Sequence, residues 1–237
     1  MDASTTLTDI RTLSLEELTS QLILTGEKKF RAQQVYQWLW EKGARSFDDM
    51  TNLSLELRDE LKEVYSLLVV TEDKVQRSSD GTIKSRFRLH DGHLIESVLI
   101  PVVADDRFTV CVSSQVGCSL SCTFCATGRM KRLRNLTAAE IYDQVFLVNE
   151  QCMETYGKPL TNIVYMGMGE PLLNYSQVLK SIERITAEDG LSMYPKRITV
   201  STASIAKLIK KLGDDKVRFN LAVSLHAAND EKRSQIM

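Results

Sequence analysis

The sequence predicts an α/β fold with a small N-terminal helical domain, a short antiparallel β meander and a parallel sheet or barrel of about four βα units. Three patterns of apolar residues support this prediction. They recur at helical spacing up to residue 66, alternate with a period of two from residue 74 to 101, and form strand-like runs separated by helical stretches after residue 108. The functional residues of such parallel arrangements lie at the carboxyl ends of the strands.

The helical domain is expected to span residues 1–72. Ser14 and Glu17 form a capping box that begins the first helix. Two further helices are expected at residues 30–42 and 54–65, where apolar side chains repeat every three to four positions. Both tryptophans of this domain are expected in its core.

The antiparallel meander is expected to span residues 73–104. Its strands alternate between apolar and polar residues, as at 83–89 and 94–100. Turn residues separate the strands at 79–81 (SDG) and at 90–92 (HDG). We expect this meander to link the helical domain to the parallel strands.

Residues 105–237 contain four predicted strands, each followed by a predicted helix. The long helix after the first strand begins at a capping box formed by Thr137 and Glu140. Four parallel strands leave open edges, so further βα units are expected after Met237 and the chain is expected to be a fragment. The strands are expected at residues 109–114, 162–166, 197–202 and 218–225, and the later helices at 176–187, 205–212 and from 229 onwards.

Composition places the chain among ordinary globular proteins. Of its 237 residues, 43% are hydrophobic and 26% are charged. Residues 1–6 lack the basic start and apolar stretch of a secretory signal, so none is expected, and no apolar run approaches the ~20 residues that span a bilayer. The net charge of −1 gives no overall sign of nucleic-acid binding. Five cysteines, three of them clustered, suit a reducing compartment, so a cytoplasmic location is expected.

Cys118, Cys122 and Cys125 form a C-x3-C-x2-C motif, which is the most informative feature of the sequence. Cubane iron–sulfur clusters usually take four thiolates, so three leave one iron free for a small molecule to chelate. The alternative is a structural zinc site, but zinc takes four ligands, usually as two separated pairs. No second pair is present at a suitable spacing among the remaining cysteines and histidines, which are Cys111, Cys152, His90, His93 and His226.

Other candidate residues follow the later strands. The turn Gly167–Pro171 (GMGEP) contains glycines that let the backbone approach a ligand, and Glu170 can accept hydrogen bonds from an ammonium group. Ser201 ends the third strand and Ser224–His226 ends the fourth, so hydroxyl and imidazole groups are expected at the same edge. Taken singly, each of these groups is more often structural.

Cys111 and Glu96 lie on predicted strands, and each has a structural alternative. Cys111 is compatible with a small apolar core residue, and Glu96 with a side chain that faces water. If Glu96 instead faces a pocket, burial would make it a usable proton acceptor.

A basic run from Arg129 to Arg134 follows the cysteine motif directly. It predicts either a solvated surface or a clamp for RNA phosphates, because clustered lysine and arginine neutralise backbone charge. Lys28, Lys29 and Arg31 form a second, weaker basic patch.

The cysteine spacing resembles the signature of radical S-adenosylmethionine (radical SAM) enzymes, and several longer stretches resemble the RlmN family in particular. The cysteine signature implies that the open iron holds the amino and carboxylate groups of SAM. The resemblance covers nearly the whole chain from about residue 12. Its stretches are Gly26–Gln34 (GEKKFRAQQ), Phe47–Thr51 (FDDMT), Gln76–Lys84 (QRSSDGTIK), Cys111–Cys118 (CVSSQVGC), Met166–Asn174 (MGMGEPLLN) and Ser224–His226 (SLH).

This resemblance implies a fold and an activity. The fold would be a partial (β/α)6 radical SAM barrel with an N-terminal RNA-contacting domain. The activity would be methylation of C2 of an adenosine in 23S rRNA and in tRNA, with a [4Fe-4S] cluster and two SAM molecules. The related Cfr type, which methylates adenine C8, matches less well around Cys118 and after Glu170.

The resemblance also implies roles for individual residues. Glu96 would be the proton acceptor, and Cys111 the thiol that resolves a protein–RNA adduct, with a disulfide bond as a further implied feature. The methyl-carrying cysteine of the family has no counterpart before Met237, so this chain alone is expected to be inactive. The implied cluster ligands are Cys118, Cys122 and Cys125, and the implied SAM-binding residues are Gly169, Glu170, Ser201, Ser224, Leu225 and His226.

The implied partners are rRNA and tRNA substrates and an electron donor such as flavodoxin or ferredoxin, with no membrane and a monomeric state. Two other classes remain open. One is a different radical SAM enzyme, such as a glycyl-radical activase or a small-molecule carbon–sulfur enzyme. The other is a non-enzymatic iron–sulfur or zinc module that only binds a partner.

Overall fold

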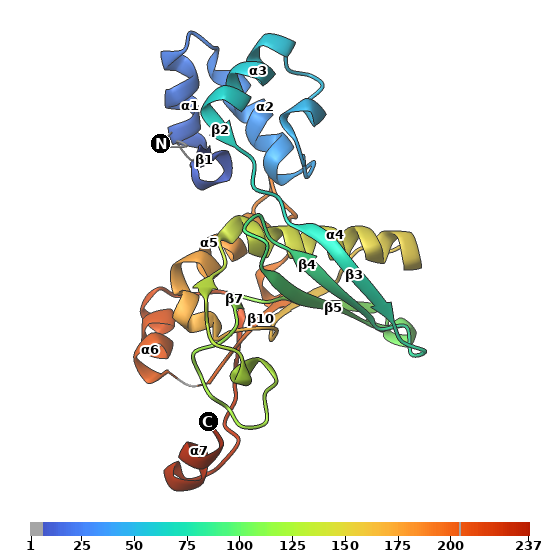
Figure 1. Cartoon of the computed structure of the whole chain (residues 1–237), viewed down its shortest axis with the longest axis vertical. Helices are drawn as coiled ribbons and strands as arrows, with labels where there is room; N and C mark the ends of the chain where they lie inside the picture. The colour runs from blue at the N-terminus through green and yellow to red at the C-terminus, as the bar shows by residue number, and fades with distance from the viewer. Residues whose placement is uncertain (1–6, 204) are drawn as a thin grey trace. The chain divides into compact units, whose positions relative to one another are not determined.

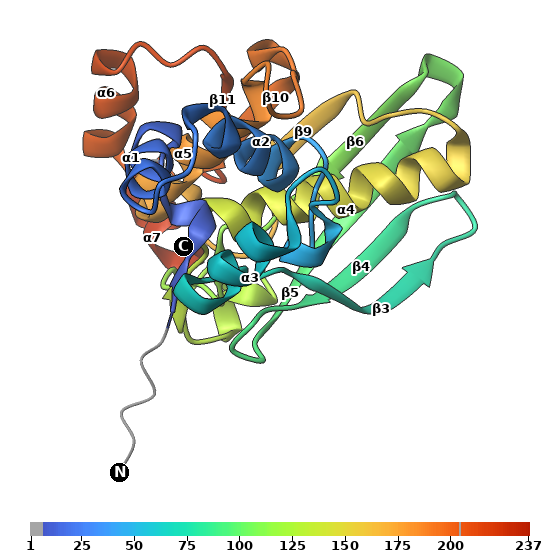
Figure 2. The same cartoon turned by 90° about the horizontal axis from the view of Figure 1, so that it is seen from above.

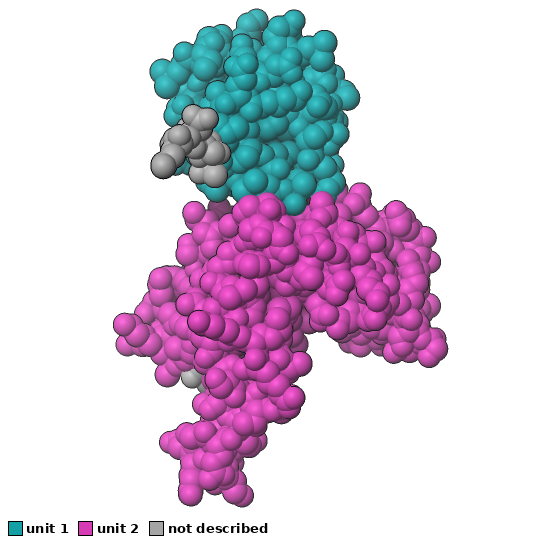
Figure 3. Space-filling view, viewed as in Figure 1, with its two compact units in different colours: residues 1–69, 187–192 teal, residues 70–186, 193–237 magenta. Residues whose placement is uncertain are grey.

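The structure is a computed structural model that describes residues 7–203 and 205–237. They form two compact units, one of residues 7–69 and 187–192 and the other of residues 70–186, 193–203 and 205–237 (Figure 3). We call them the N-terminal unit and the sheet unit. No helix within the described residues is both long and apolar enough to cross a membrane.

The N-terminal unit consists mainly of helices, as predicted (Figure 1). Its first helix begins at the predicted capping box, in which the Ser14 and Glu17 side chains each accept a backbone N–H from the other residue. A two-residue parallel strand pair, which the sequence did not predict, joins the beginning of the unit to the end of its third helix. The elements are β1 (Thr8–Asp9), α1 (Leu15–Leu24), α2 (Lys29–Trp40), α3 (Leu55–Val64) and β2 (Tyr65–Ser66).

The two tryptophans of this unit differ in burial. Trp40 is 2% exposed and belongs to the core, as expected. The same expectation is wrong for Trp38, which is half-buried, with its indole N–H donating to Asn52 Oδ1 at 2.5 Å. The Lys42 ammonium lies 4.2 Å from the centre of the Trp38 ring. An indole N–H needs an acceptor, and at this half-buried position Asn52 provides one, so the N–H of Trp38 is not buried without a partner.

The sheet unit contains one seven-stranded sheet in the order β11-β10-β9-β6-β5-β4-β3. The four strands β6, β9, β10 and β11 are parallel, and β3, β4 and β5 are antiparallel to their neighbours. Since β5 also pairs with β6, the predicted meander and the parallel strands share one sheet. The strands are β3 (Thr71–Arg77), β4 (Ile83–Arg88), β5 (Leu94–Val102), β6 (Arg107–Cys111), β9 (Asn162–Tyr165), β10 (Ile198–Thr202) and β11 (Asn220–Val223).

The predicted α/β class is confirmed, since a helix follows each parallel strand. The sheet does not close into a barrel within the described residues. Between β6 and the first of these helices lies a loop pinned by a short antiparallel pair, β7 (Gln115–Val116) with β8 (Arg134–Asn135), which the sequence did not predict. The helices are α4 (Ala138–Tyr156), α5 (Tyr175–Thr186), α6 (Ala206–Asp214) and α7 (Asp230–Ile236).

The two faces of this sheet have different surroundings. Figure 2 shows α4 alongside the strands, and its glutamines hydrogen-bond to the sheet: Ser97 Oγ donates to Gln144 Oε1 at 2.9 Å, and Ser85 Oγ donates to Gln151 Oε1 at 3.0 Å. We call this side the helix-covered face. Side chains of successive strand residues point to opposite sides, so every second residue belongs to it. Many of those residues are at most 1% exposed, namely Ile83, Ser85, Phe87, Ile95, Ser97, Leu99, Val110, Ile163, Ile198 and Val200.

The residues between them form the open face, where side chains are half-buried or exposed. Strand register places Glu96, Cys111 and Ser201 on this face, because paired residues of neighbouring strands share a side. One row across it consists of Gln76, Lys84, Val98, Cys111, Val164 and Thr199. All candidate chemistry on the strands therefore lies on the side that the helices leave uncovered.

Candidate active site

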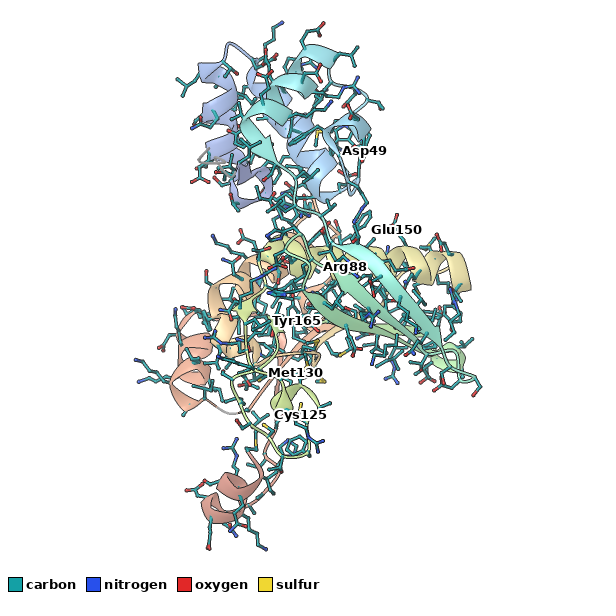
Figure 4. All side chains as sticks on the ribbon, in the orientation of Figure 1. Asp49, Arg88, Cys125, Met130, Glu150 and Tyr165 are labelled. Atoms are coloured by element: carbon teal, nitrogen blue, oxygen red, sulfur yellow. The ribbon has the colours of Figure 1, made fainter. Side chains whose placement is uncertain are left out.

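A pocket of about 330 Å³ lies at the carboxyl ends of the parallel strands, under the loop that carries the cysteine motif. Figure 4 labels Cys125 and Met130 on this loop and Tyr165 at the end of β9. The structure brings together most of the predicted site residues around this pocket. Its lining includes Cys118, Cys122, Cys125, Gly169, Glu170, Ser201, Ser224 and His226, together with Phe124, Tyr165, Met166, Thr202 and Ala203.

The cysteine loop has its shape because two glycines fit where no other residue would. Gly117 has φ +74°, and a Cβ there would lie 2.3 Å from the carbonyl oxygen of Lys131. A Cβ on Gly128 would lie 2.7 Å from the carbonyl oxygen of Cys122. Both ends of the loop therefore pack backbone against backbone. The Cys125 N–H donates to the Cys122 carbonyl oxygen at 3.1 Å, and this turn sets the relative placement of the two cysteines.

The three thiols of the cysteine motif share the wall of one pocket. Among the described residues, no three His, Cys, Asp or Glu side chains converge closely enough to bind one ion. In a cubane cluster each thiolate binds a different iron, so the three cysteines need only share one wall of a pocket. Burial raises the pKa of Cys118 and of Cys122, and nearby thiols and Glu170 add to the rise. Binding of iron would therefore displace their protons.

Glu170 is a buried carboxylate held in one orientation by backbone groups. It is 4% exposed. Its Oε1 accepts from the Leu172 N–H at 3.0 Å, and its Oε2 accepts from the Ala203 N–H at 2.8 Å. No Lys, Arg or His within the described residues forms an ion pair with it. A carboxylate of this kind at a pocket wall suits an ammonium group of a ligand, because each oxygen accepts more than one hydrogen bond.

The glycines of the GMGEP turn bring Glu170 to this position. Gly169 has φ +96°, and a Cβ there would lie 2.5 Å from the Cβ of Gln115 on β7. The neighbouring Glu170 N–H donates to Gln115 Oε1 at 2.9 Å. The turn therefore packs directly on the strand that precedes the cysteine loop, and any larger residue at 169 would separate the two.

The serines and His226 lie at the ends of β10 and β11. The hydroxyls of Ser201 and Ser224 are 3.4 Å apart. The His226 ring centre lies 4.4 Å from that of Phe124 in the cysteine loop, and its backbone has φ +56°. Leu225 is different, because its side chain is 58% exposed and is absent from the pocket lining. The expectation that Leu225 belongs to the SAM site is therefore not supported for its side chain.

Glu96 and Cys111 lie on the open face but not in the pocket wall. The Glu96 carboxylate is 2.8 Å from the Lys84 ammonium, and its side chain is 42% exposed. The burial that the sequence argument requires of a proton acceptor is therefore not found at Glu96. Burial does raise the pKa of Cys111, and the N–H of Met166, a pocket residue, opposes that rise.

The comparisons with known proteins agree with this geometry. Residues 8–67 match the profile of the ribosomal RNA large subunit methyltransferase N-terminal domain, and residues 112–237 match that of the radical SAM superfamily. The chain belongs to the radical SAM superfamily. The predicted resemblance to the RlmN family is also confirmed by the relatives.

Several radical SAM relatives resemble nearly all of this chain. A probable dual-specificity RNA methyltransferase RlmN of Cytophaga hutchinsonii is 62% identical over 228 residues, which are 96% of this chain and 62% of that protein. The Flavobacterium psychrophilum protein of the same name is 55% identical, covering 97% of this chain and 65% of that protein. The chain thus spans slightly less than two thirds of the length of these relatives.

A solved structure shows the same fold. It is a radical SAM methyltransferase from Sphaerobacter thermophilus, with a TM-score of 0.88 and 41% identity. The likeness covers 97% of this chain and 67% of that one.

Not all expectations for this radical SAM chain are met. The five cysteines are all free, so the expected disulfide bond is not formed. Cys111 lies on the open face of the sheet, whereas Cys152 is buried on α4 over the other face. The sheet itself therefore separates these two thiols.

The basic run after the radical SAM cysteines is only partly available for RNA. Arg134 binds both oxygens of Glu140, at 2.8 and 2.7 Å, and its Nε lies 2.6 Å from Asp91 Oδ2. The hydrogen bonds that Arg134 donates to Glu140 raise the pKa of Arg134 despite burial. Burial alone would raise the pKa of Asp91, but the bond from Arg134 and other contacts lower it to about 2. The expected phosphate clamp is thus reduced to Arg129, Lys131 and Arg132.

Some residues near the site were not singled out from the sequence. Gln115 supports the GMGEP turn, and Arg233 on α7 donates to the Ala203 carbonyl oxygen beside the pocket. Thr123 in the cysteine loop donates its N–H to the Ile236 carbonyl oxygen at 2.9 Å. Gln115 lies inside the stretch CVSSQVGC, which was a usable signal, whereas nothing in the local pattern at Arg233 predicts this contact.

Proposed function

We propose that this chain belongs to an enzyme that methylates C2 of an adenosine in 23S rRNA and in tRNA. The observation that carries the proposal is a single pocket that joins the three cysteines to Glu170 at the ends of the parallel strands. Identity of 62% to a probable dual-specificity RNA methyltransferase and the match of residues 8–67 to a ribosomal RNA methyltransferase domain support RNA as the substrate.

The cofactors of the proposed enzyme are a [4Fe-4S] cluster and two SAM molecules. Cys118, Cys122 and Cys125 would hold the cluster, since their thiols share the pocket wall. Together, the bound cluster and SAM supply an electron and radical chemistry that can activate a methyl group. The protein's own contribution is to bind, orient and exclude water.

In this proposal, Glu170 orients the ammonium group of SAM, because two backbone N–H groups fix its carboxylate. Gly169 lets the backbone approach the ligand. Further contacts to SAM come from the Ser201 and Ser224 hydroxyls, the His226 ring and the backbone of Leu225.

Glu96 and Cys111 would act on the RNA side of the reaction. Glu96 accepts a proton from the adenine, and Cys111 resolves the protein–RNA adduct. Support comes from their position on the open face and from Ser113, whose hydroxyl donates to the Glu96 carbonyl oxygen at 2.7 Å and accepts the Met168 N–H at 2.9 Å. This bond chain ties the backbone of Glu96 to the pocket loop.

The partners proposed with this function are an electron donor such as flavodoxin or ferredoxin and the RNA substrates, with the enzyme acting as a cytoplasmic monomer. Five free thiols are compatible with a reducing compartment. Methylation at adenine C8, the Cfr type, is the alternative. Methylation at C2 is favoured by the residues Gln115–Gly117 before Cys118 and by the residues that follow Glu170.

A chimera tests the proposal. This chain replaces the matching 228 residues of the Cytophaga hutchinsonii protein, and the chimera is reconstituted anaerobically with iron and sulfide. With reductant and SAM labelled at its methyl group, we expect label at adenosine C2 of 23S rRNA and tRNA transcripts. An EPR signal that changes when SAM is added reports cofactor binding separately. Label at C8, or an unchanged EPR signal and no label while the parent protein is active, would contradict the proposal.

A further inference from the structure

The antiparallel end of the open face carries a group of cations. Strand register places Lys74 opposite Arg86, and Arg86 opposite Glu96. In the next row, Lys84 lies between Gln76 and Val98, and that row continues to Cys111. The rows of basic side chains therefore run along the sheet to the two residues that would act on the RNA base.

These cations outnumber the acids beside them. The basic side chains are Lys74, Lys84, Arg86 and Arg88, and the acids are Asp73 and Glu96. Four positive charges and two negative charges leave a local excess of two positive charges, in a chain whose formal net charge is −1. Lys74 is exposed and makes no ion pair with any described residue, and Arg86 is exposed although it binds Asp73 at 2.5 Å.

The shape of this surface favours an extended anion over a small one. Five of its residues line a shallow depression of about 120 Å³: Lys74, Gln76, Lys84, Arg86 and Glu96. Neighbouring strands lie about 4.8 Å apart, and alternate residues of one strand are about 7 Å apart. Long flexible cations on such a grid can reach successive phosphates of one nucleic-acid strand.

We propose that the open face of β3, β4 and β5 binds the phosphate backbone of the RNA strand that carries the target adenosine. Lys74 and Arg86 are the main phosphate ligands, and Lys84 contacts the strand where it reaches Glu96. The inference rests on the proposed function, since it takes RNA as the substrate and Glu96 as the group that meets the base. It gives the sheet unit an RNA-contacting surface of its own, besides the one expected on the helical N-terminal unit.

The test measures binding of a fluorescein-labelled RNA hairpin to this chain across a series of salt concentrations. The variant is Lys74→Gln with Arg86→Gln. The matched control, Lys207→Gln with Lys210→Gln, removes two exposed lysines from α6. Affinity falls as salt rises, and each lost phosphate contact reduces the magnitude of the slope of log affinity against log salt by roughly 0.7–0.9. We expect the variant to lose about 1.4–1.8 from the slope, and the control to keep the wild-type slope.

The other outcomes are distinguishable. An unchanged slope in the variant, or an equal loss in variant and control, overturns the inference and leaves the proposed function standing. Absence of salt-dependent RNA binding by the wild-type chain overturns the inference together with RNA as the substrate class. Equal binding of polyglutamate, lost in the same variant, would assign the face to acidic peptides instead. Lys74→Gln alone removes an exposed side chain without an ion pair, so it serves if the double variant does not fold.

Discussion

At the scale of single residues, Glu170 shows how a loop can hold a charge ready for a ligand. Its two oxygens accept the N–H groups of Leu172 in its own turn and of Ala203 just after β10. A buried carboxylate without a cation is costly unless its lone pairs are used. Backbone donors offset part of that cost, and a bound ammonium group would offset more.

We predict that Glu170→Gln weakens SAM binding by roughly ten- to a hundredfold, because a charge-assisted hydrogen bond contributes about 1.5–3 kcal/mol. Isothermal titration calorimetry of the reconstituted wild type and variant with SAM measures the two affinities. The iron content of Glu170→Gln should equal that of wild type. Glu183→Gln on the exposed side of α5 is the matched control. Wild-type SAM affinity in Glu170→Gln would remove the ammonium-binding role.

The cysteines give a second prediction at this scale. Cys122→Ala should abolish the cluster, whereas Cys152→Ala should keep it. Burial raises the pKa of Cys152 to about 11, and its side chain is fully buried on α4, away from the pocket lining. The iron and sulfide content of each variant after anaerobic reconstitution measures whether it holds a cluster. Loss of iron in Cys152→Ala with normal iron in Cys122→Ala would overturn the ligand assignment.

At the scale of elements, α4 connects the sheet to the site. It begins at the Thr137 capping box, and its buried Gln144 bonds to both β5 and the segment after β6. Gln144 Oε1 accepts from Ser97 Oγ and from the Ser113 N–H, and its Nε2 donates to the Ser113 carbonyl oxygen at 3.1 Å. The Ser113 hydroxyl in turn donates to the backbone carbonyl of Glu96, so hydrogen bonds through Gln144 and Ser113 connect α4 to the backbone of Glu96 on β5.

We predict that Gln144→Ala lowers the free energy of unfolding by at least about 2 kcal/mol, because each buried polar group left without a partner costs roughly 1–3 kcal/mol. Urea unfolding of the chain measures the change. Glu154→Ala, an exposed change on the same helix, should stay within about 0.5 kcal/mol of wild type. A similar small effect in both variants would show that the glutamine contacts contribute little.

The ion pair of Arg134 and Asp91 makes stability depend on pH. The folded pKa of Asp91, about 2, is lower than its ordinary value of 3.8. Its contribution is therefore fully present above pH 3.8 and is lost as the pH falls towards 2. We predict that wild type is more stable than Asp91→Asn at neutral pH and that this difference shrinks between pH 4 and 2. A difference that stays constant down to pH 2 would show that Asp91 does not stabilise the fold through its charge.

At the scale of the whole molecule, the sequence predicts the elements well and their partners less well. Capping boxes at Ser14 and Thr137 and the period-two strands depend on neighbouring residues, so α1, α4 and β4 lie where expected. The pairing of β5 with β6 and the Arg134 ion pairs join residues far apart in the chain. Local patterns carry no record of such contacts. The motifs predicted most of the pocket lining, but they left open whether Glu96 faces water, and they did not predict the partial exposure of Trp38.

The two faces of the sheet imply that tolerance to mutation alternates along the strands. On β4, Ile83, Ser85 and Phe87 are sealed under α4, so replacements there should reduce the amount of folded protein. Lys84, Arg86 and Arg88 lie between them on the open side, so replacements there should leave folding intact and alter what the protein does. A saturation library sorted once for protease resistance and once for RNA binding should give two interleaved sets of sensitive positions. On this one short strand, alternate positions would then be constrained by two different requirements, stability of the fold on one face and binding of the substrate on the other.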